Sequence, residues 1–152
     1  MNKELELIFG GLLKDLDFVK ALFEHMSHFS NSGIIITDKD AVIIEVNPAF
    51  SRLMGYSRDE IIGETPRKLL WSGHQDASFF KEMWDDIIDI DTWTGRIWDR
   101  SKSGKIFPVM MAIKKIELNE NNKVYYAGLY NEILQIGEQE EPRNIKFYDE
   151  NL

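Results

Sequence analysis

Three histidines are the side chains of this sequence whose type and spacing come nearest to a chemical site. His25 and His28 lie three residues apart, a spacing at which two imidazoles can share a metal ion. Two ligands make a poor site, however, and no third ligand is placed nearby, so we interpret the pair as surface or dimer-face residues. His74 follows a Ser-Gly pair just before a predicted helix. No Ser-His-Asp arrangement, phosphate loop or pair of catalytic carboxylates is recognisable, and we expect this chain not to be an enzyme.

A run of aspartates is the second candidate, near the end of the same predicted helix. It comprises Asp85, Asp86, Asp89 and Asp91. A helix C-terminus disfavours acidic residues through its dipole. We nevertheless interpret the run as a solvated face and not as a calcium site, and we expect no metal.

Composition excludes several classes of protein. The chain has 152 residues and no cysteine, which rules out a disulfide scaffold, a thiolate metal site, a cysteine nucleophile and a flavin–cysteinyl adduct. It carries 18 basic and 26 acidic residues, a net charge of −8, so nucleic-acid binding is not expected. No apolar run approaches the length of a membrane span, and the N-terminus lacks the order of a signal peptide. The sequence therefore predicts a cytoplasmic protein.

The elements that must position any site begin with an amphipathic helix over residues 2–29. Its apolar residues recur at steps of three and four, which indicates one apolar stripe. The stripe contains Leu5, Ile8, Leu12, Leu16, Val19, Leu22, Phe23 and Met26. Such a stripe is buried either on its own domain or on a second copy of the chain. We predict a homodimer whose face is formed by Leu5, Ile8, Leu12, Val19, Leu22 and Met26.

Strand patterns occur at both ends of the remaining sequence, with helical patterns between them. The predicted strands are 33–37, 41–46, 93–100, 105–118 and 123–133, and the predicted helices are 47–54, 57–62, 66–70 and 76–90. Asn47, Ser57 and either Asp76 or Ser78 have the residue types of helix N-caps, and Glu60 completes a capping box with Ser57. This order predicts an α+β domain with one five-stranded antiparallel sheet and helices on one face.

The motifs resemble those of a PAS domain, in family order. The first half carries Gly33-Ile34-Ile35-Ile36-Thr37-Asp38, Val46-Asn47-Pro48-Ala49-Phe50, Met54-Gly55-Tyr56-Ser57 and Glu60-Ile61-Ile62-Gly63. The second half carries Ser72-Gly73-His74, Phe79-Phe80-Lys81-Glu82-Met83-Trp84, Trp93 to Arg100, Lys102 to Pro108 and Tyr126-Ala127-Gly128-Leu129. The resemblance implies a PAS domain over residues 31–134, after a flanking helix over 1–30.

The subtype resembles sensory modules that precede diguanylate cyclase, phosphodiesterase or histidine kinase domains. Residues 137–141 form an acidic linker, and residues 145–152 are similar to the segment that enters a diguanylate cyclase domain. We therefore expect residues 135–152 to connect to a covalently attached output domain, most specifically a diguanylate cyclase.

The resemblance also implies a cavity between the sheet and the helices. Strand alternation turns Gly95, Ile97 and Asp99 to one face, which the resemblance makes the inner one. The candidate ligand-binding residues are Phe50, Trp71, Phe80, Trp84, Ile97, Asp99, Val109, Met111 and Tyr130. A cavity of this composition suits a flat aromatic molecule or a fatty chain.

The cofactor is left open. Flavin-binding PAS domains carry an asparagine at the position of Asp99, and the light-sensing subgroup has two further amide residues where this chain has Val109 and Tyr130. The reactive cysteine of the light-sensing subgroup aligns near Pro66 of this chain, so light-driven adduct chemistry is excluded. FAD redox sensing and the absence of any cofactor remain equal alternatives. Haem is disfavoured, and His74 is its only candidate ligand. The sequence therefore leaves three interpretations of the function of this domain: a ligand or redox sensor, an FAD redox sensor, or a ligand-free dimerisation scaffold.

Overall fold

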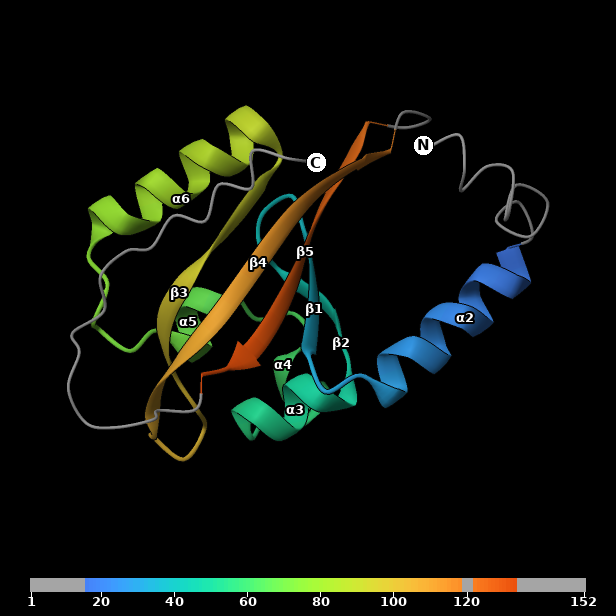
Figure 1. The fold of residues 1–152 in the computed structure, drawn as a ribbon, viewed down its shortest axis with the longest axis horizontal. Coiled ribbons are helices and arrows are strands. Elements are labelled where there is room, and N and C mark those ends of the chain that lie inside the picture. The colour runs from blue at the N-terminus through green and yellow to red at the C-terminus, as the bar shows by residue number, and fades with distance from the viewer. Residues whose placement is uncertain (1–15, 119–121, 134–152) are drawn as a thin grey trace. The chain divides into compact units, whose positions relative to one another are not determined.

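The computed structural model describes residues 16–118 and 122–133, which Figure 1 shows as ribbons. The chain divides into two compact units, Met1–Ser30 and Asn31–Leu152. In the first unit, helix α2 spans Leu16–Phe29. Leu5, Ile8 and Leu12 lie outside the described residues. Leu22, Phe23 and Met26 are exposed by 38, 45 and 61 %, so the described part of the predicted apolar stripe is largely uncovered.

The second unit is built on one antiparallel sheet of five strands, as predicted. The strands are β1 (Gly33–Asp38), β2 (Ile43–Val46), β3 (Thr92–Arg100), β4 (Ile106–Leu118) and β5 (Lys123–Glu132). Their order in the sheet is β2-β1-β5-β4-β3, so the first and last strands of the unit lie side by side at its centre (Figure 1). All four pairings are antiparallel.

Four helices connect the two halves of the sheet. They are α3 (Pro48–Met54), α4 (Arg58–Ile61), α5 (Pro66–Leu70) and α6 (Ala77–Ile90). Helix α3 contacts β1, α4 contacts β2, α5 contacts β3, and α6 contacts β3 and β4. The predicted caps are confirmed: Asn47, Ser57 and Asp76 each accept a hydrogen bond from a backbone N–H of the first turn. Ser57 and Glu60 form the predicted capping box.

All five strands differ from the prediction by one or two residues at one end, and two of these differences concern the second and the last strand. The second strand begins at Ile43 and not at residue 41, because Ala41 has a φ of 60° and belongs to the turn that precedes it. The last strand ends at Glu132, one residue earlier than predicted. Both differences lie at element ends and leave the pairing of the sheet unchanged.

Asn47 joins β1, α3 and the segment before β1. Its side-chain Oδ1 accepts hydrogen bonds from the backbone N–H of Ile34 (2.7 Å) and of Phe50 (2.9 Å). Its Nδ2 donates to the carbonyl oxygen of Ser32 at 3.0 Å. The side chain is buried, so these bonds exchange with no bulk water. One amide group thereby fixes where the first strand starts and where the first connecting helix begins.

The hydrophobic core lies between the helices and one face of the sheet. Its most deeply buried side chains are Phe50, Ile43, Met54, Ile61, Ile87 and Val109. In the part of the chain that the structure describes, we find no helix that is both long and apolar enough to span a membrane.

Candidate ligand cavity

A cavity of about 460 Å³ lies against the sheet, is lined on its other side by helices α5 and α6, and is partly open to solvent. The strands contribute alternate residues to it, namely Ile35, Thr37, Ile97, Asp99, Met111, Ile113, Tyr126, Gly128 and Tyr130. The helices and turns contribute Asp40, Ala41, Thr65, Pro66, Arg67, Leu70, Trp71, Ala77, Phe80, Lys81, Met83 and Trp84. The two-residue spacing on β1, β3, β4 and β5 shows that one face of the sheet forms the wall, as the alternation of Ile97 and Asp99 predicted.

Most of the predicted site residues line this cavity. Those that do so are Trp71, Phe80, Trp84, Ile97, Asp99, Met111 and Tyr130. The predicted inward face of β3 also includes Gly95, which is buried but does not reach the cavity. A Cβ built on Gly95 would lie 2.5 Å from the ring of Trp93, so the indole ring already occupies that space.

Phe50 and Val109 do not line the cavity, in contrast to the prediction. Phe50 is 1 % exposed and packs edge-on against the ring of Tyr130, with centroids 5.2 Å apart. Val109 has no exposed surface and belongs to the same core cluster. Both side chains are therefore packing residues, and Phe50 touches the ring of Tyr130 in the cavity wall.

Sequence reasoning missed several residues of the wall. Tyr126 and Gly128 share the inward face of β5 with Tyr130, and strand alternation alone would have found them. Gly128 must lack a side chain here, because a Cβ on it would lie 2.8 Å from Cγ2 of Ile35. Arg67 and Lys81 are charged residues of helices, and nothing in their spacing distinguished them from ordinary surface residues.

Asp99 is the buried acidic residue of the cavity. It is 4 % exposed, and its backbone pairs with Phe107 on β4 and with Trp71. Burial raises the pKa of the Asp99 carboxyl group to about 7. Within residues 16–118 and 122–133, the carboxyl group has neither a hydrogen bond nor an ion pair, and burial is the sole cause of its shift.

Arg96, Arg100 and Tyr130 are the side chains that could pair with Asp99, and the structure distinguishes among them. Arg96 and Arg100 differ from Asp99 by odd numbers of residues, so they point to the other face of β3. Tyr130 lies close enough to interact with it: burial raises the pKa of the Tyr130 hydroxyl well above its usual value, and the Asp99 carboxylate raises it further. Asp99 and Tyr130 therefore form the polar end of the cavity.

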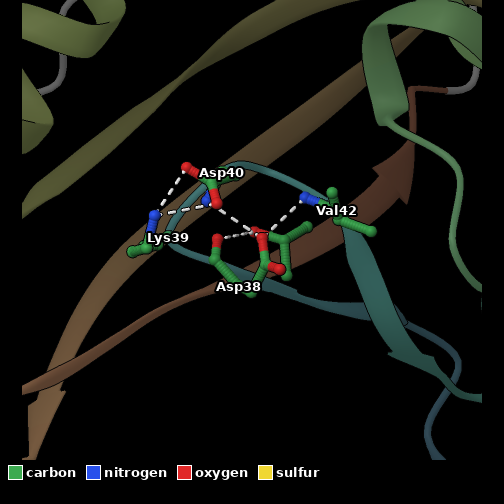
Figure 2. Close-up of polar contacts among 5 residues, drawn as sticks. Asp38, Lys39, Asp40 and Val42 are labelled. Carbon is green, nitrogen blue, oxygen red and sulfur yellow. Dashed lines mark hydrogen bonds and ion pairs between the residues drawn. The ribbon is translucent and has the colours of Figure 1, made fainter.

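The turn between β1 and β2 forms part of the rim. The Oδ1 atom of Asp38 accepts hydrogen bonds from the backbone N–H groups of Asp40 (2.9 Å) and Val42 (3.0 Å), as Figure 2 shows. The Nζ atom of Lys39 pairs with the carboxylate of Asp40 at 2.8 Å (Figure 2). These contacts stabilise the turn in which Ala41 adopts a positive φ, and they hold Asp40 and Ala41 beside the cavity.

The histidines do not form a metal or haem site in the described residues. His74 is absent from the cavity wall; its ring stacks on Trp98, with centroids 5.4 Å apart. Trp98 points to the face of β3 opposite Asp99. His25 and His28 both contact the ring of Phe29. Among residues 16–118 and 122–133, no three His, Asp or Glu side chains are grouped to hold a metal ion.

The cavity does not fit the flavin contacts that the resemblance implies. No Asn or Gln side chain of the described residues lines it, Val109 is turned into the core, and Tyr130 supplies a hydroxyl where the light-sensing relatives have an amide. Pro66 lies in the wall near the position of their reactive cysteine, and the sequence contains no cysteine. The polar end of a flavin would meet a carboxyl group here and no side-chain amide.

A sheet and short helices that enclose an apolar cavity with one buried carboxyl group define an α+β domain of the sensor class. The family model of the PAS domain matches residues 31–135, and this chain belongs to that family. The PAS fold predicted from the sequence is thus confirmed.

Relatives and solved structures agree with the assignment. The nitrogen fixation regulatory proteins of Klebsiella oxytoca and Klebsiella pneumoniae are 29 and 28 % identical over 112 residues, which is 74 % of this chain. The matched region spans 22 % of each relative, so this chain corresponds to about a fifth of their length.

Two solved structures illustrate the shared fold. A PAS domain from Colwellia psychrerythraea superposes with a TM-score of 0.68 at 23 % identity, covering 76 % of this chain and 97 % of that one. The LOV domain of a blue-light activated histidine kinase from Erythrobacter litoralis superposes with a TM-score of 0.61 at 22 % identity, covering 70 and 99 %. At these identities the likeness concerns the fold alone.

Proposed function

We propose that this PAS domain is the sensory module of a signal-transduction protein and that it binds a small molecule in the cavity beside Asp99. The observation that carries the proposal is the cavity itself, about 460 Å³ in volume, with aromatic and aliphatic walls and one buried carboxyl group. Cavities of this size and composition are typical of small-molecule sites. The domain acts by binding and not by catalysis.

Strand β5 connects the cavity to the C-terminal segment. Tyr126, Gly128 and Tyr130 line the cavity from this strand, and the chain continues from Glu132 into the C-terminal residues. A ligand that binds one arrangement of β5 more tightly than another shifts the population toward that arrangement, to the extent of its differential affinity. The proposed signal therefore leaves the domain along β5.

An output domain attached after residue 134 completes the proposal. Residues 145–152 favour a diguanylate cyclase, and the kinase-associated PAS and LOV domains among the similar folds make a histidine kinase the alternative. The cytoplasmic location expected from composition belongs to the same proposal.

The protein as purified is expected to release a small molecule on denaturation, detected by mass spectrometry and by the absorbance of the supernatant. Ile113 lines the cavity, so Ile113→Trp places an indole ring in the ligand's space and should lower the released amount at least about tenfold. Ile116 on the same strand is 40 % exposed and faces the other side, so Ile116→Trp is the matched control and should release as much as the wild type.

A different result favours the ligand-free scaffold. If the wild type releases nothing, or if both variants release the same amount as the wild type, the cavity is not a small-molecule site. The domain would then serve to hold two output domains together, which was the alternative interpretation of the sequence.

We also propose a homodimer that is formed through the apolar stripe of α2. Val19, Leu22, Phe23 and Met26 share one side of the helix. Leu22→Asp combined with Met26→Asp places two charges in that stripe and should raise the dissociation constant at least about a hundredfold, measured by light scattering across a dilution series. Ala21→Asp with His28→Asp alters the opposite side and should leave the mass unchanged. A dimer that survives the first pair of substitutions would exclude this face.

A further inference from the structure

The cavity contains a buried carboxyl group without a counter-charge. Asp99 is 4 % exposed, lies in the cavity wall, and has no hydrogen bond or ion pair with any described residue. Buried carboxylates in folded proteins are normally paired with a cation or hydrogen-bonded, because an isolated buried charge is strongly disfavoured. The partner of Asp99 is therefore expected to come from outside the described chain.

Two cationic side chains reach the cavity, and each contacts a group other than Asp99. The Nζ atom of Lys81 pairs with the carboxylate of Asp85 one helical turn away, at 2.5 Å. The guanidinium group of Arg67 lies over the ring of Phe80, 5.8 Å from its centroid. The other titratable groups in the wall are Asp40 and the hydroxyls of Tyr126 and Tyr130, none of which supplies a positive charge.

The remaining wall is rich in aromatic rings. Trp71, Phe80, Trp84, Tyr126 and Tyr130 all line the cavity. Trp84 and Tyr126 meet edge to face, with centroids 5.0 Å apart, so these two rings form one joint surface. Aromatic faces attract organic cations through their quadrupoles, most strongly where water is excluded.

We infer that the cavity takes an organic cation: a small molecule whose ammonium or amidinium group pairs with Asp99 and whose apolar body lies among the aromatic rings. This inference rests on the proposed function and names the class of its ligand. The carboxylate supplies the charge that a desolvated cation needs, and the rings supply both cation–π attraction and apolar contact. The net charge of −8 favours the approach of such a molecule.

The pairing couples binding to the protonation of Asp99. Burial keeps this carboxyl group protonated below about pH 7 in the ligand-free protein. An ammonium group binds the ionised form, so one proton leaves the carboxyl group for solvent when the cation binds under those conditions. Affinity for a cation must therefore rise with pH up to about 7 and then level off, whereas a neutral or anionic ligand shows no such rise.

Three probes with one indole body separate the ligand classes: tryptamine, tryptophol and indole-3-acetate, titrated into the full chain by calorimetry at pH 5, 6, 7 and 8. At pH 8 tryptamine should bind at least about tenfold more tightly than either of the other two. Its affinity should fall by about tenfold per pH unit below pH 7. Asp99→Asn should lose both the preference and the pH dependence and still bind tryptophol, which shows that the cavity is intact.

Other outcomes overturn the inference. It is wrong if tryptophol or indole-3-acetate binds as tightly as tryptamine at pH 8, if Asp99→Asn keeps the preference, or if no probe binds at millimolar concentration. The proposed function is judged separately, by the release experiment with Ile113→Trp. A released neutral or anionic molecule would support a ligand sensor and contradict the cationic ligand class.

Discussion

Replacing Asp99 by asparagine is expected to raise the free energy of unfolding by roughly 4 kcal/mol at pH 8 and to change it little at pH 4. Burial raises the pKa of this carboxyl group from 3.8 to about 7 in the folded protein. Between these two values the folded state holds a proton that the unfolded state has lost. The contribution of Asp99 to stability therefore falls as pH rises from about 4 to about 7, and it stays at its lowest level above pH 7.

Asparagine removes this dependence because it has the shape of the protonated acid and carries no charge. Urea denaturation of the wild type and the variant at pH 4, 5, 6, 7 and 8 would measure the difference, which should grow by about 1.4 kcal/mol per pH unit and then level off. Asp89→Asn changes an exposed carboxyl group on α6 and is the matched control, with an expected change below about 0.5 kcal/mol at every pH. A difference for Asp99→Asn that does not vary with pH would show that the carboxyl group is hydrated or paired.

The same substitution separates stability from ligand binding. If Asp99 exists to pair with a cationic ligand, the more stable Asn variant is the one that no longer recognises that ligand. Groups that lower the stability of the free protein are expected at binding sites, where the ligand supplies the missing partner. The stability measured in urea and the affinity measured by calorimetry should therefore change in opposite directions.

The sequence predicted the elements well because their signals are local. The hydrogen bonds that cap the helices at Asn47, Ser57 and Asp76 come from backbone N–H groups of the next helical turn, so residue type and position identified Asn47 and Ser57 and left Asp76 and Ser78 as alternatives. Alternation placed Ile97 and Asp99 on one face of β3, the resemblance made that face the inner one, and both residues line the cavity. Boundaries were less certain, as the positive φ of Ala41 illustrates.

Parts of the site were not predictable from local patterns. Phe50 and Val109 have the residue types of a ligand wall, but whether a buried side chain faces a cavity or another side chain depends on how the helices pack against the sheet. Arg67 and Lys81 were missed for the opposite reason: charged residues of helices are usually solvated, and only the position of α5 and α6 brings them to the rim. The missing counter-charge of Asp99 likewise follows from which face of β3 the neighbouring arginines occupy.

Replacing Asn47 by alanine is expected to lower the free energy of unfolding by about 2 to 4 kcal/mol, because it removes three hydrogen bonds of a buried amide group. The backbone N–H groups of Ile34 and Phe50 would lose their acceptor, and the carbonyl oxygen of Ser32 would lose a donor. Asn47→Asp keeps the acceptor but removes the donor, so its effect at pH 8 should differ from that of alanine. Asn131→Ala, which removes one exposed bond to Ser32, is the matched control and should cost less than about 1 kcal/mol.

Asn47 lies between the cavity wall and the N-terminal side of the domain, so it is a position at which coupling between the two can be tested. The backbone N–H of Phe50 donates to Asn47, and the ring of Phe50 packs on Tyr130 in the cavity wall. Asn47 also donates to the carbonyl oxygen of Ser32, which precedes the first strand. Packed contacts of this kind carry coupling only if they have two arrangements, so contact alone does not establish a pathway. Amide hydrogen exchange of residues 31–36, measured with and without bound tryptamine, decides the question. The comparison requires that Asn47→Asp still binds tryptamine. If tryptamine changes the protection of these amides in the wild type but not in Asn47→Asp, the Asn47 amide links the cavity to the start of β1. If the protection changes equally in both proteins, β5 alone carries the effect, through its direct pairing with β1.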